Sequence, residues 1–118
     1  AFKGLPAADQ VAALPSRLRA EATLDQDMRV GIRYLDVHEE FRLHLRRGVL
    51  EVAHKPVGDA ALVLEVTREA MGGLLSGVAL RELLHAPTLK VVGDLAAAER
   101  FVGYFERPFT SKPEVVVR

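Results

Sequence analysis

The chain has 118 residues, which is enough for one domain and too few for two ordinary ones. Its 16 basic and 16 acidic side chains cancel, so it lacks the basic excess typical of proteins that bind nucleic acid or anionic membranes. It has no cysteine, which excludes disulfides and thiolate metal sites. Its longest stretch without a charge, Ala70 to Leu80, is well short of the ~18 residues that a membrane-spanning helix needs.

The N-terminal region predicts a helix followed by a polar connection. The helix begins at residues 6–9, and its apolar positions are Val11, Leu14 and Leu18. Pro15 falls inside this pattern and predicts a kink or a restarted turn. Because the N-terminus lacks the long apolar core of a signal peptide, we expect a cytoplasmic protein.

A period of two then replaces the helical period, which is typical of strands that are buried on one face. Residues 28–34 and 41–46 alternate in this way around a polar turn at 36–39, and they predict a hairpin. Arg47-Gly48 forms a tight corner before a third strand at 49–54, because glycine suits a positive φ. After a loop, the apolar run ALVLEV at 61–66 predicts a fourth strand.

The next segment predicts two short helices. Thr67 is suited to cap the first, since a threonine hydroxyl accepts from the free N–H groups of a helix start. Residues 68–86 carry the helical pattern, with a break near Ser76-Gly77 and an end at Pro87.

The C-terminal part predicts a fifth strand at 89–92 and a closing helix capped by Asp94. Strands that come before most of the helices indicate an α+β fold, a five-stranded mostly antiparallel sheet with helices packed on one face. We expect residues 1–118 to form a single domain, with its core at about 7–109 and a tail at 110–118.

The polar residues do not form a recognisable active site. The four histidines show no HxH or HExxH spacing, and no serine lies in a GxSxG turn. The acidic cluster at 36–40 has a metal-binding and a structural interpretation, and a solvated turn explains it more simply. We therefore predict no catalytic residue, no metal and no cofactor.

One face of the predicted hairpin is basic. If the alternation holds, its exposed side chains are Arg29, Arg33, Arg42, His44 and Arg46. One interpretation is a solvated sheet face that Glu51 and Glu65 partly neutralise through cross-strand pairs. The other is a face that binds an anion or a partner, because guanidinium groups grip sulfate, phosphate or carboxylate with two hydrogen bonds. Both interpretations stay open at this point.

The helices carry more apolar residues than a narrow stripe requires. Core packing explains most of them without a ligand. Yet Gly72, Gly73 and Gly77 leave gaps in a helical region, where each glycine costs up to about 1 kcal/mol relative to alanine. Such gaps let a backbone or an alkyl chain approach closely.

Taken together, ALVLEVTREAMGGLLSG and LRELLHAPTLKVVGDLAAAERFVGYFE resemble a sterol-carrier-protein-like domain. The resemblance is closest to the C-terminal domain of class III alkyl sulfatases, zinc enzymes of the metallo-β-lactamase superfamily. That domain has "NGVL" at the end of its meander and "LKVxGD" before its last helix, and the counterparts here are residues 47–50 and 89–94. The resemblance implies a sheet and helices that enclose an apolar tunnel or groove, which helps to receive an aliphatic tail. The HxHxDH zinc signature of the catalytic domain is absent from this chain.

The leading hypothesis is a non-catalytic module that binds long-chain apolar or amphipathic molecules, alone or beside a metallo-β-lactamase-like catalytic domain. Its expected apolar lining comprises Ile32, Leu43, Met71, Leu74, Leu75, Leu83, Leu84, Phe101 and Phe105. Its expected anion contacts are Arg29, Arg33, Arg42 and Arg46. The alternative is a structural module with a filled core that forms a homodimer or docks onto a partner domain. An intact enzyme is the third and least supported hypothesis.

Overall fold

The structure is a computed structural model that describes residues 2–84 and 88–106. Its elements in chain order are η1 (Phe2–Gly4), α1 (Ala7–Ala12), η2 (Pro15–Arg17), η3 (Ala20–Ala22), β1 (Asp27–Tyr34), β2 (Glu40–Arg46), β3 (Val49–Ala53), β4 (Leu62–Val66), α2 (Arg68–Leu75), α3 (Leu80–Leu83), β5 (Leu89–Val92) and α4 (Leu95–Gly103). The predicted helix stop at Pro87 and the predicted tail at 110–118 lie outside the described residues.

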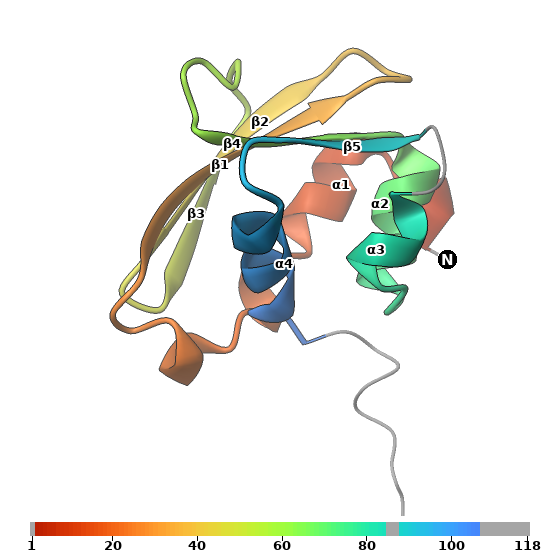
Figure 1. The fold of residues 1–118 in the computed structure, drawn as a ribbon. Coiled ribbons are helices and arrows are strands. Elements are labelled where there is room, and N and C mark those ends of the chain that lie inside the picture. The colour runs from red at the N-terminus through yellow and green to blue at the C-terminus, as the bar shows by residue number, and fades with distance from the viewer. Residues whose placement is uncertain (1, 85–87, 107–118) are drawn as a thin grey trace, which may run out of the picture.

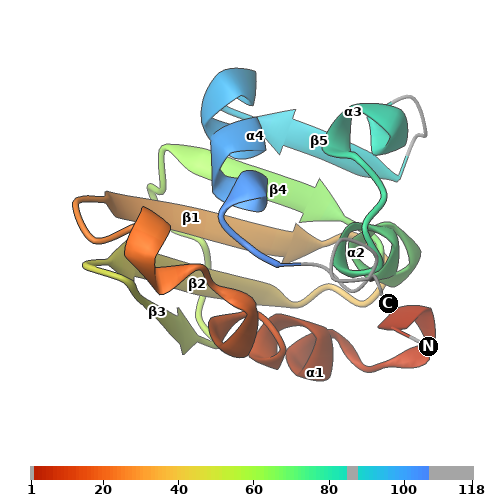
Figure 2. The same ribbon diagram turned by 90° about the horizontal axis from the view of Figure 1, so that it is seen from below.

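The strands form one five-stranded sheet in the order β3-β2-β1-β4-β5 (Figure 1). The β1–β2, β2–β3 and β4–β5 pairs are antiparallel, whereas β1 and β4 run parallel. Helices α1 to α4 all lie on one side of this sheet (Figures 1 and 2). The predicted α+β fold with a mostly antiparallel sheet and helices on one face is therefore confirmed.

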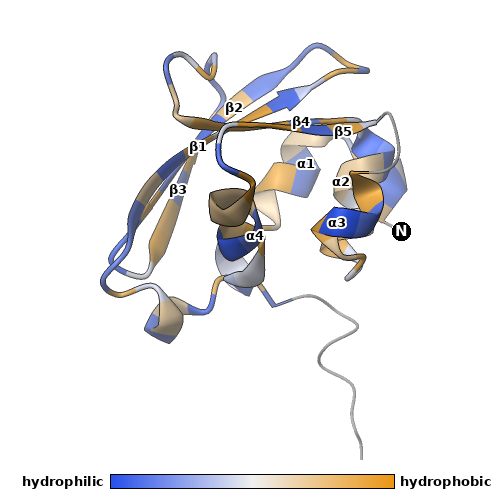
Figure 3. Cartoon of the chain, viewed as in Figure 1, coloured by the Kyte–Doolittle hydropathy of each residue, from blue (hydrophilic) through white to orange (hydrophobic). Residues whose placement is uncertain are grey.

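The register places apolar residues on the side that faces the helices. Val30 lies opposite Leu43 and Ile32 lies opposite Phe41, and all four are almost fully buried. Because side chains alternate between the faces of a strand, the neighbouring arginines Arg29, Arg33 and Arg42 point to the other face. Figure 3 shows this alternation of hydrophobic and hydrophilic residues along the strands.

The connection from β3 to β4 crosses the sheet on the face away from the helices. It has to cross because β3 lies at one edge and β4 lies beside β1. Val57 in this loop is only 2 % exposed and packs on Gly31, where an added Cβ would lie 2.6 Å from the Val57 Cβ. Arg42 in β2 also holds the loop, since its Nη2 donates to the carbonyl oxygen of Pro56 at 2.8 Å. Because Gly31 has no side chain, Val57 of the loop can pack directly against β1.

The two predicted N-caps and the predicted break between the helices are confirmed. Thr67 Oγ1 accepts from the backbone N–H of Ala70 at 3.2 Å at the start of α2. Asp94 Oδ1 accepts from the N–H of Ala96 at 3.2 Å at the start of α4. The break after α2 coincides with Gly77, whose φ is 105°. Each contact satisfies a backbone group that a helix end leaves free.

A buried polar network ties the N-terminal helix to the sheet and to α2. The Gln10 side chain is fully buried, and its Nε2 donates to the carbonyl oxygens of Phe2 at 2.7 Å and Arg68 at 2.9 Å. The hydroxyl of Tyr34 donates to Gln10 Oε1 at 2.8 Å. Burial in this place raises the pKa of Tyr34 above its usual value. The amide thus joins three separate elements, η1, β1 and α2.

Other residues of the chain occupy the space beside the glycines of α2. A Cβ on Gly72 would lie 2.8 Å from the Cα of Lys3, so the backbone of η1 occupies this gap. A Cβ on Gly73 would lie 3.6 Å from the Leu83 side chain. The sequence predicted that either a backbone or an alkyl chain could approach these glycines closely. At Gly72 it is a backbone, that of Lys3.

Candidate functional site

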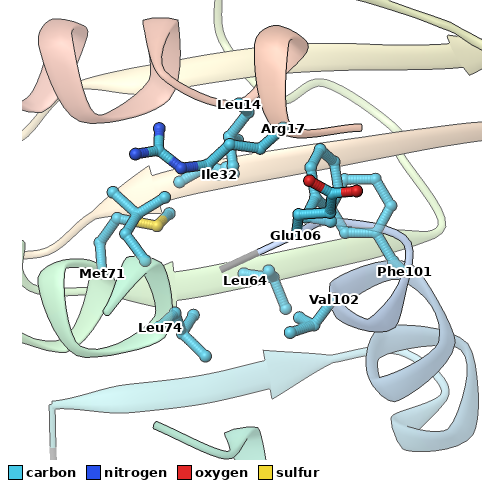
Figure 4. A pocket seen from close by; sticks show the side chains of 11 residues that line it. Leu14, Arg17, Ile32, Leu64, Met71, Leu74, Phe101, Val102 and Glu106 are labelled. Carbon is cyan, nitrogen blue, oxygen red and sulfur yellow. The ribbon is translucent and has the colours of Figure 1, made fainter. Parts of the chain in front are cut away.

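An apolar cavity lies between the sheet and the helices that cover it (Figure 4). Its walls are formed by Leu14, Arg17, Ile32, Leu64, Met71, Leu74, Leu75, Phe101, Val102, Phe105 and Glu106. They come from β1, β4, α2, α4 with the residues that directly follow it, and the segment around η2. Nine of the eleven are apolar, and the two charged residues are Arg17 and Glu106.

Local sequence spacing explains why these side chains converge. Ile32 of β1 lies beside Leu64 of β4 in the parallel register, so both form the sheet side of the cavity. Met71, Leu74 and Leu75 recur three and four residues apart in α2, which places them on one helix face. The rings of Phe101 and Phe105 repeat this spacing four residues apart, with their centroids 5.2 Å from each other.

The cavity is small as it stands. Its volume is about 30 Å³, whereas pockets for drug-sized ligands have about 300–1,000 Å³. A cavity needs roughly 10–15 Å³ on a comparable measure to hold one water molecule. The present space therefore fits a guest of water size, and an alkyl chain can enter only if a wall moves.

The structure brings together most of the predicted lining. Ile32, Met71, Leu74, Leu75, Phe101 and Phe105 border the cavity. Leu43 is fully buried in the core but is not among the lining residues. Leu83 and Leu84 are half-buried at the end of α3 and also lie outside the lining.

Five lining residues were missing from the predicted set: Leu14, Arg17, Leu64, Val102 and Glu106. The three apolar ones follow the helix and strand periods, so the signal for them was present in the sequence. No pattern marked the two charged ones. Arg17 reaches the cavity because the chain restarts as η2 at Pro15. Glu106 is held there by its backbone N–H, which donates to the carbonyl oxygen of Arg17 at 2.7 Å.

Arg17 and Glu106 occupy different parts of the cavity rim (Figure 4). The Arg17 guanidinium lies on the side of Met71, whereas the Glu106 carboxylate lies on the side of Phe101. Arg17 Nη1 donates to the carbonyl oxygen of Ala13 at 3.2 Å. Its guanidinium carbon is 4.8 Å from the centroid of the Phe2 ring, a cation–π contact. Within the described residues no carboxylate oxygen forms an ion pair with Arg17.

The four arginines predicted to contact an anion lie on the opposite face of the sheet. Arg33 is paired there with Glu65 at 2.7 Å and Glu40 at 3.1 Å. The pKa of Glu40 is lowered by the backbone N–H of Val57 and by Arg33. Arg42 donates to the crossing loop, and the exposed Arg29 and Arg46 share this face. The sheet separates all four from the cavity, so their role as anion contacts stays a prediction that concerns the outer face alone.

A groove lies between α3 and α4. It is lined by Ala79, Leu80, Arg81, Glu99, Val102 and Gly103. Arg81 and Glu99 close it with an ion pair whose Nε–Oε2 distance is 2.5 Å. Val102 lines both this groove and the inner cavity. The wall between the two spaces is therefore one side chain thick at Val102.

The histidines and carboxylates that the structure describes do not converge on a metal site. In residues 2–84 and 88–106, no three His, Asp or Glu side chains form a group able to hold a metal ion. His44 Nε2 lies 2.7 Å from Asp27 Oδ1, which lowers the pKa of that carboxyl. His54 stacks on Phe41 with ring centroids 4.4 Å apart. The helices of the described part are all too short or too polar to cross a membrane.

Residues 2–111 match the family model described as alkyl sulfatase C-terminal. None of the curated protein sequences matches the chain. Two solved structures of the sec-alkylsulfatase Pisa1 are similar to it. The protein from Pseudomonas sp. has 22 % identity and a TM-score of 0.72 over 79 % of this chain. A double mutant has 20 % identity and a TM-score of 0.79 over 89 % of this chain. The chain spans only 15 % and 17 % of these two proteins.

Two smaller proteins share the fold over most of their own length. The ubiquinone synthesis protein UbiJ-SCP2 has 19 % identity and a TM-score of 0.58, with 87 % of this chain and 82 % of that protein covered. The palmitated SCP2L2 of Aedes aegypti has 11 % identity and a TM-score of 0.58, with coverages of 84 % and 93 %. At these identities the likeness shows a sterol-carrier-protein-like fold and no more.

Proposed function

The chain belongs to the alkyl sulfatase C-terminal family, and on this premise we propose that it binds the alkyl chain of a long-chain apolar or amphipathic molecule without catalysing a reaction itself. The binding site is the cavity between the sheet and helices α2 and α4. The observation that carries the proposal is the composition of its walls, where nine apolar side chains from five segments meet. A wall that is apolar in nine of its eleven residues selects guests mainly by apolar area.

Similar proteins add support to this proposal. SCP2L2 is described as palmitated, and it shares the fold of this chain at a TM-score of 0.58. A palmitoyl group has the chemistry that the lining residues favour, a flexible chain of methylene groups. At 11 % identity this likeness supports the fold, and the apolar lining of the cavity supports the binding of an alkyl chain.

Binding requires the cavity to widen, and the wall at Val102 is thin because this residue borders both the cavity and the groove between α3 and α4. Across that wall, the ion pair that bridges α3 and α4 in the described part of the chain is Arg81–Glu99, in which Arg81 is 74 % exposed and Glu99 is half-buried. Exposed ion pairs contribute about 0–1 kcal/mol, so separating the two helices loses little electrostatic energy. The sheet side is fixed by its hydrogen-bonded strands. We therefore place the movement in the helices.

The energetics suit a weak, reversible complex. Each buried methylene contributes about 0.8 kcal/mol, so a dodecyl chain gains ~10 kcal/mol at most. Lost rigid-body and chain freedom takes back several kcal/mol, which leaves an affinity of about micromolar.

The small share of Pisa1 that the chain covers points to a larger setting. We propose that this module lies beside a metallo-β-lactamase-like catalytic domain and holds the alkyl chain of that domain's substrate. The zinc chemistry would belong to the partner domain, since no HxHxDH motif occurs in this chain.

The volume of about 30 Å³ favours a second candidate, a docking or dimerising module with a filled core. Its contact surface would include exposed apolar residues such as Leu24 and Val49, which are 61 % and 58 % exposed. They flank the β2–β3 turn, because Leu24 Cδ2 lies 3.1 Å from where a Cβ on Gly48 would be. Large apolar side chains left in water often mark such interfaces.

Calorimetric titration below the micelle concentration separates the two candidates. Dodecyl sulfate and dodecyl maltoside have the same tail and differ in charge, so a tail site binds both saturably. Leu74→Trp fills the cavity, whereas Val92→Trp adds the same ring on the outer face, where Val92 is 41 % exposed. We expect binding to survive in the second variant and to be lost in the first, with both folded by circular dichroism. Absence of saturable binding of either detergent to the wild type contradicts the proposal and favours docking.

A further inference from the structure

The geometry points to Arg17 as the residue that binds an anionic headgroup at the cavity rim, so that the ligand is an amphiphile with a negative head. This inference rests on the proposed function, because the head is placed by a tail in the cavity. Arg17 belongs to the cavity wall, and it is the one basic residue among those that line it. Its guanidinium lies at the edge of the cavity, on the side of Met71 (Figure 4), where it can reach the polar group at the end of an inserted alkyl chain.

The Arg17 guanidinium is held in place with donors to spare. It has five N–H donors, and one hydrogen bond of its side chain is to the carbonyl oxygen of Ala13 at 3.2 Å. The guanidinium carbon lies over the Phe2 ring, 4.8 Å from its centroid, and this contact helps to hold the group in place. No ion pair within the described residues uses the remaining donors. Because the side chain is already ordered, little further rotamer freedom is lost when an anion binds.

The other charged groups do not compete for this role. Arg33 is engaged with two carboxylates, and the sheet separates it from the cavity. Glu106 lies on the other side of the rim, towards Phe101, and it repels an anion instead of binding it. The rim therefore has a polarity, with the anion site on the Met71 side. Sulfate, carboxylate and phosphate heads all share the oxygen geometry that a guanidinium binds with two hydrogen bonds.

The test compares three ligands with one tail: dodecyl sulfate, dodecyl maltoside and dodecyltrimethylammonium. Each is titrated into the wild type and into Arg17→Gln, Glu106→Gln and Arg29→Gln. Arg29→Gln is the matched control, because it removes the same charge from the exposed outer face. We expect Arg17→Gln to weaken dodecyl sulfate about tenfold or more, with dodecyl maltoside unchanged. Glu106→Gln should strengthen dodecyl sulfate a few-fold, and Arg29→Gln should change neither ligand.

A direct readout distinguishes contact from a structural role of Arg17. The ¹⁵Nε resonance of Arg17 should shift on titration with dodecyl sulfate and stay in place with dodecyl maltoside. The inference is overturned if both detergents bind and Arg17→Gln weakens them equally, or if Arg29→Gln weakens dodecyl sulfate as much. Tighter binding of dodecyltrimethylammonium than of dodecyl sulfate would overturn it as well, because it would show that the Glu106 carboxylate binds the headgroup. If none of the three ligands binds, the proposed function itself is contradicted. If the ligands bind but Arg17→Gln has no selective effect, only the role of Arg17 is contradicted. Repeating the anionic arm with dodecanoate shows whether a sulfate or a carboxylate head is preferred.

Discussion

Removing the Tyr34 hydroxyl tests the buried network that joins the N-terminal helix, the sheet and α2. In Tyr34→Phe, Gln10 Oε1 loses its donor at 2.8 Å while it stays fully buried. The amide cannot compensate by turning over. Its Nε2 is committed to two carbonyl oxygens, those of Phe2 and Arg68, and a flip would break both bonds.

A buried acceptor left without a partner costs about 1–3 kcal/mol. With a urea slope of ~2 kcal/mol per M, a loss of about 2 kcal/mol lowers the midpoint of unfolding by about 1 M. Tyr104→Phe is the matched control. Tyr104 is half-buried at the end of α4, and its hydroxyl has no hydrogen bond to any residue that the structure describes. We expect its midpoint to move by about a quarter of this shift or less.

The same side chain makes a pH-dependent prediction. Burial raises the pKa of Tyr34 in the folded state, so the unfolded chain releases this proton first as the pH rises. Stability that is complete below the unfolded pKa of about 10 is then lost progressively at higher pH. Urea titrations from pH 8 to 11 should show this fall in the wild type and a flatter profile in Tyr34→Phe. Equal midpoints for Tyr34→Phe and Tyr104→Phe at neutral pH would refute the reasoning.

Three further predictions concern the frame of the site. Gly31→Ala pushes a Cβ to 2.6 Å from Val57 and should cost about 1–3 kcal/mol in thermal unfolding, whereas Gly103→Ala, with nothing within 4 Å, should be neutral or stabilising. Asp94→Ala removes the cap of α4 and should cost about 1 kcal/mol, and an unchanged urea midpoint would contradict that role. The pKa of Glu40 is lowered in the folded state, so its contribution is present above the ordinary carboxylate range and lost on acidification. Glu40→Gln should therefore flatten the acid side of the stability profile, which a urea series between pH 3 and 7 checks.

The periodic parts of the structure were predictable from the sequence because each depends on neighbours along the chain. The strand at 28–34, the Thr67 and Asp94 caps and the break at Gly77 all follow from local rules. Most of the cavity lining was also predictable, since residues three and four apart on a helix share a face.

The long-range features were not predictable. The parallel pairing of β1 with β4 depends on a loop crossing the outer face, and only the fold shows that Gly31 makes room for Val57. Gln10 carries no sign in the sequence that its amide links three segments. Arg17 was overlooked for a similar reason, because a charged residue beside a proline kink gives no indication that it borders an apolar cavity.

The central claim is that an alkyl chain enters the space between the sheet and helices α2 and α4. Its most direct test is an NMR experiment on methyl-labelled protein with dodecanoate below its micelle concentration. We expect intermolecular NOEs from the alkyl chain to the methyl groups of Met71 and Leu74, which line the cavity. NOEs confined to exposed methyl groups such as those of Leu24 and Val49, or no NOEs at saturating ligand, would contradict the account.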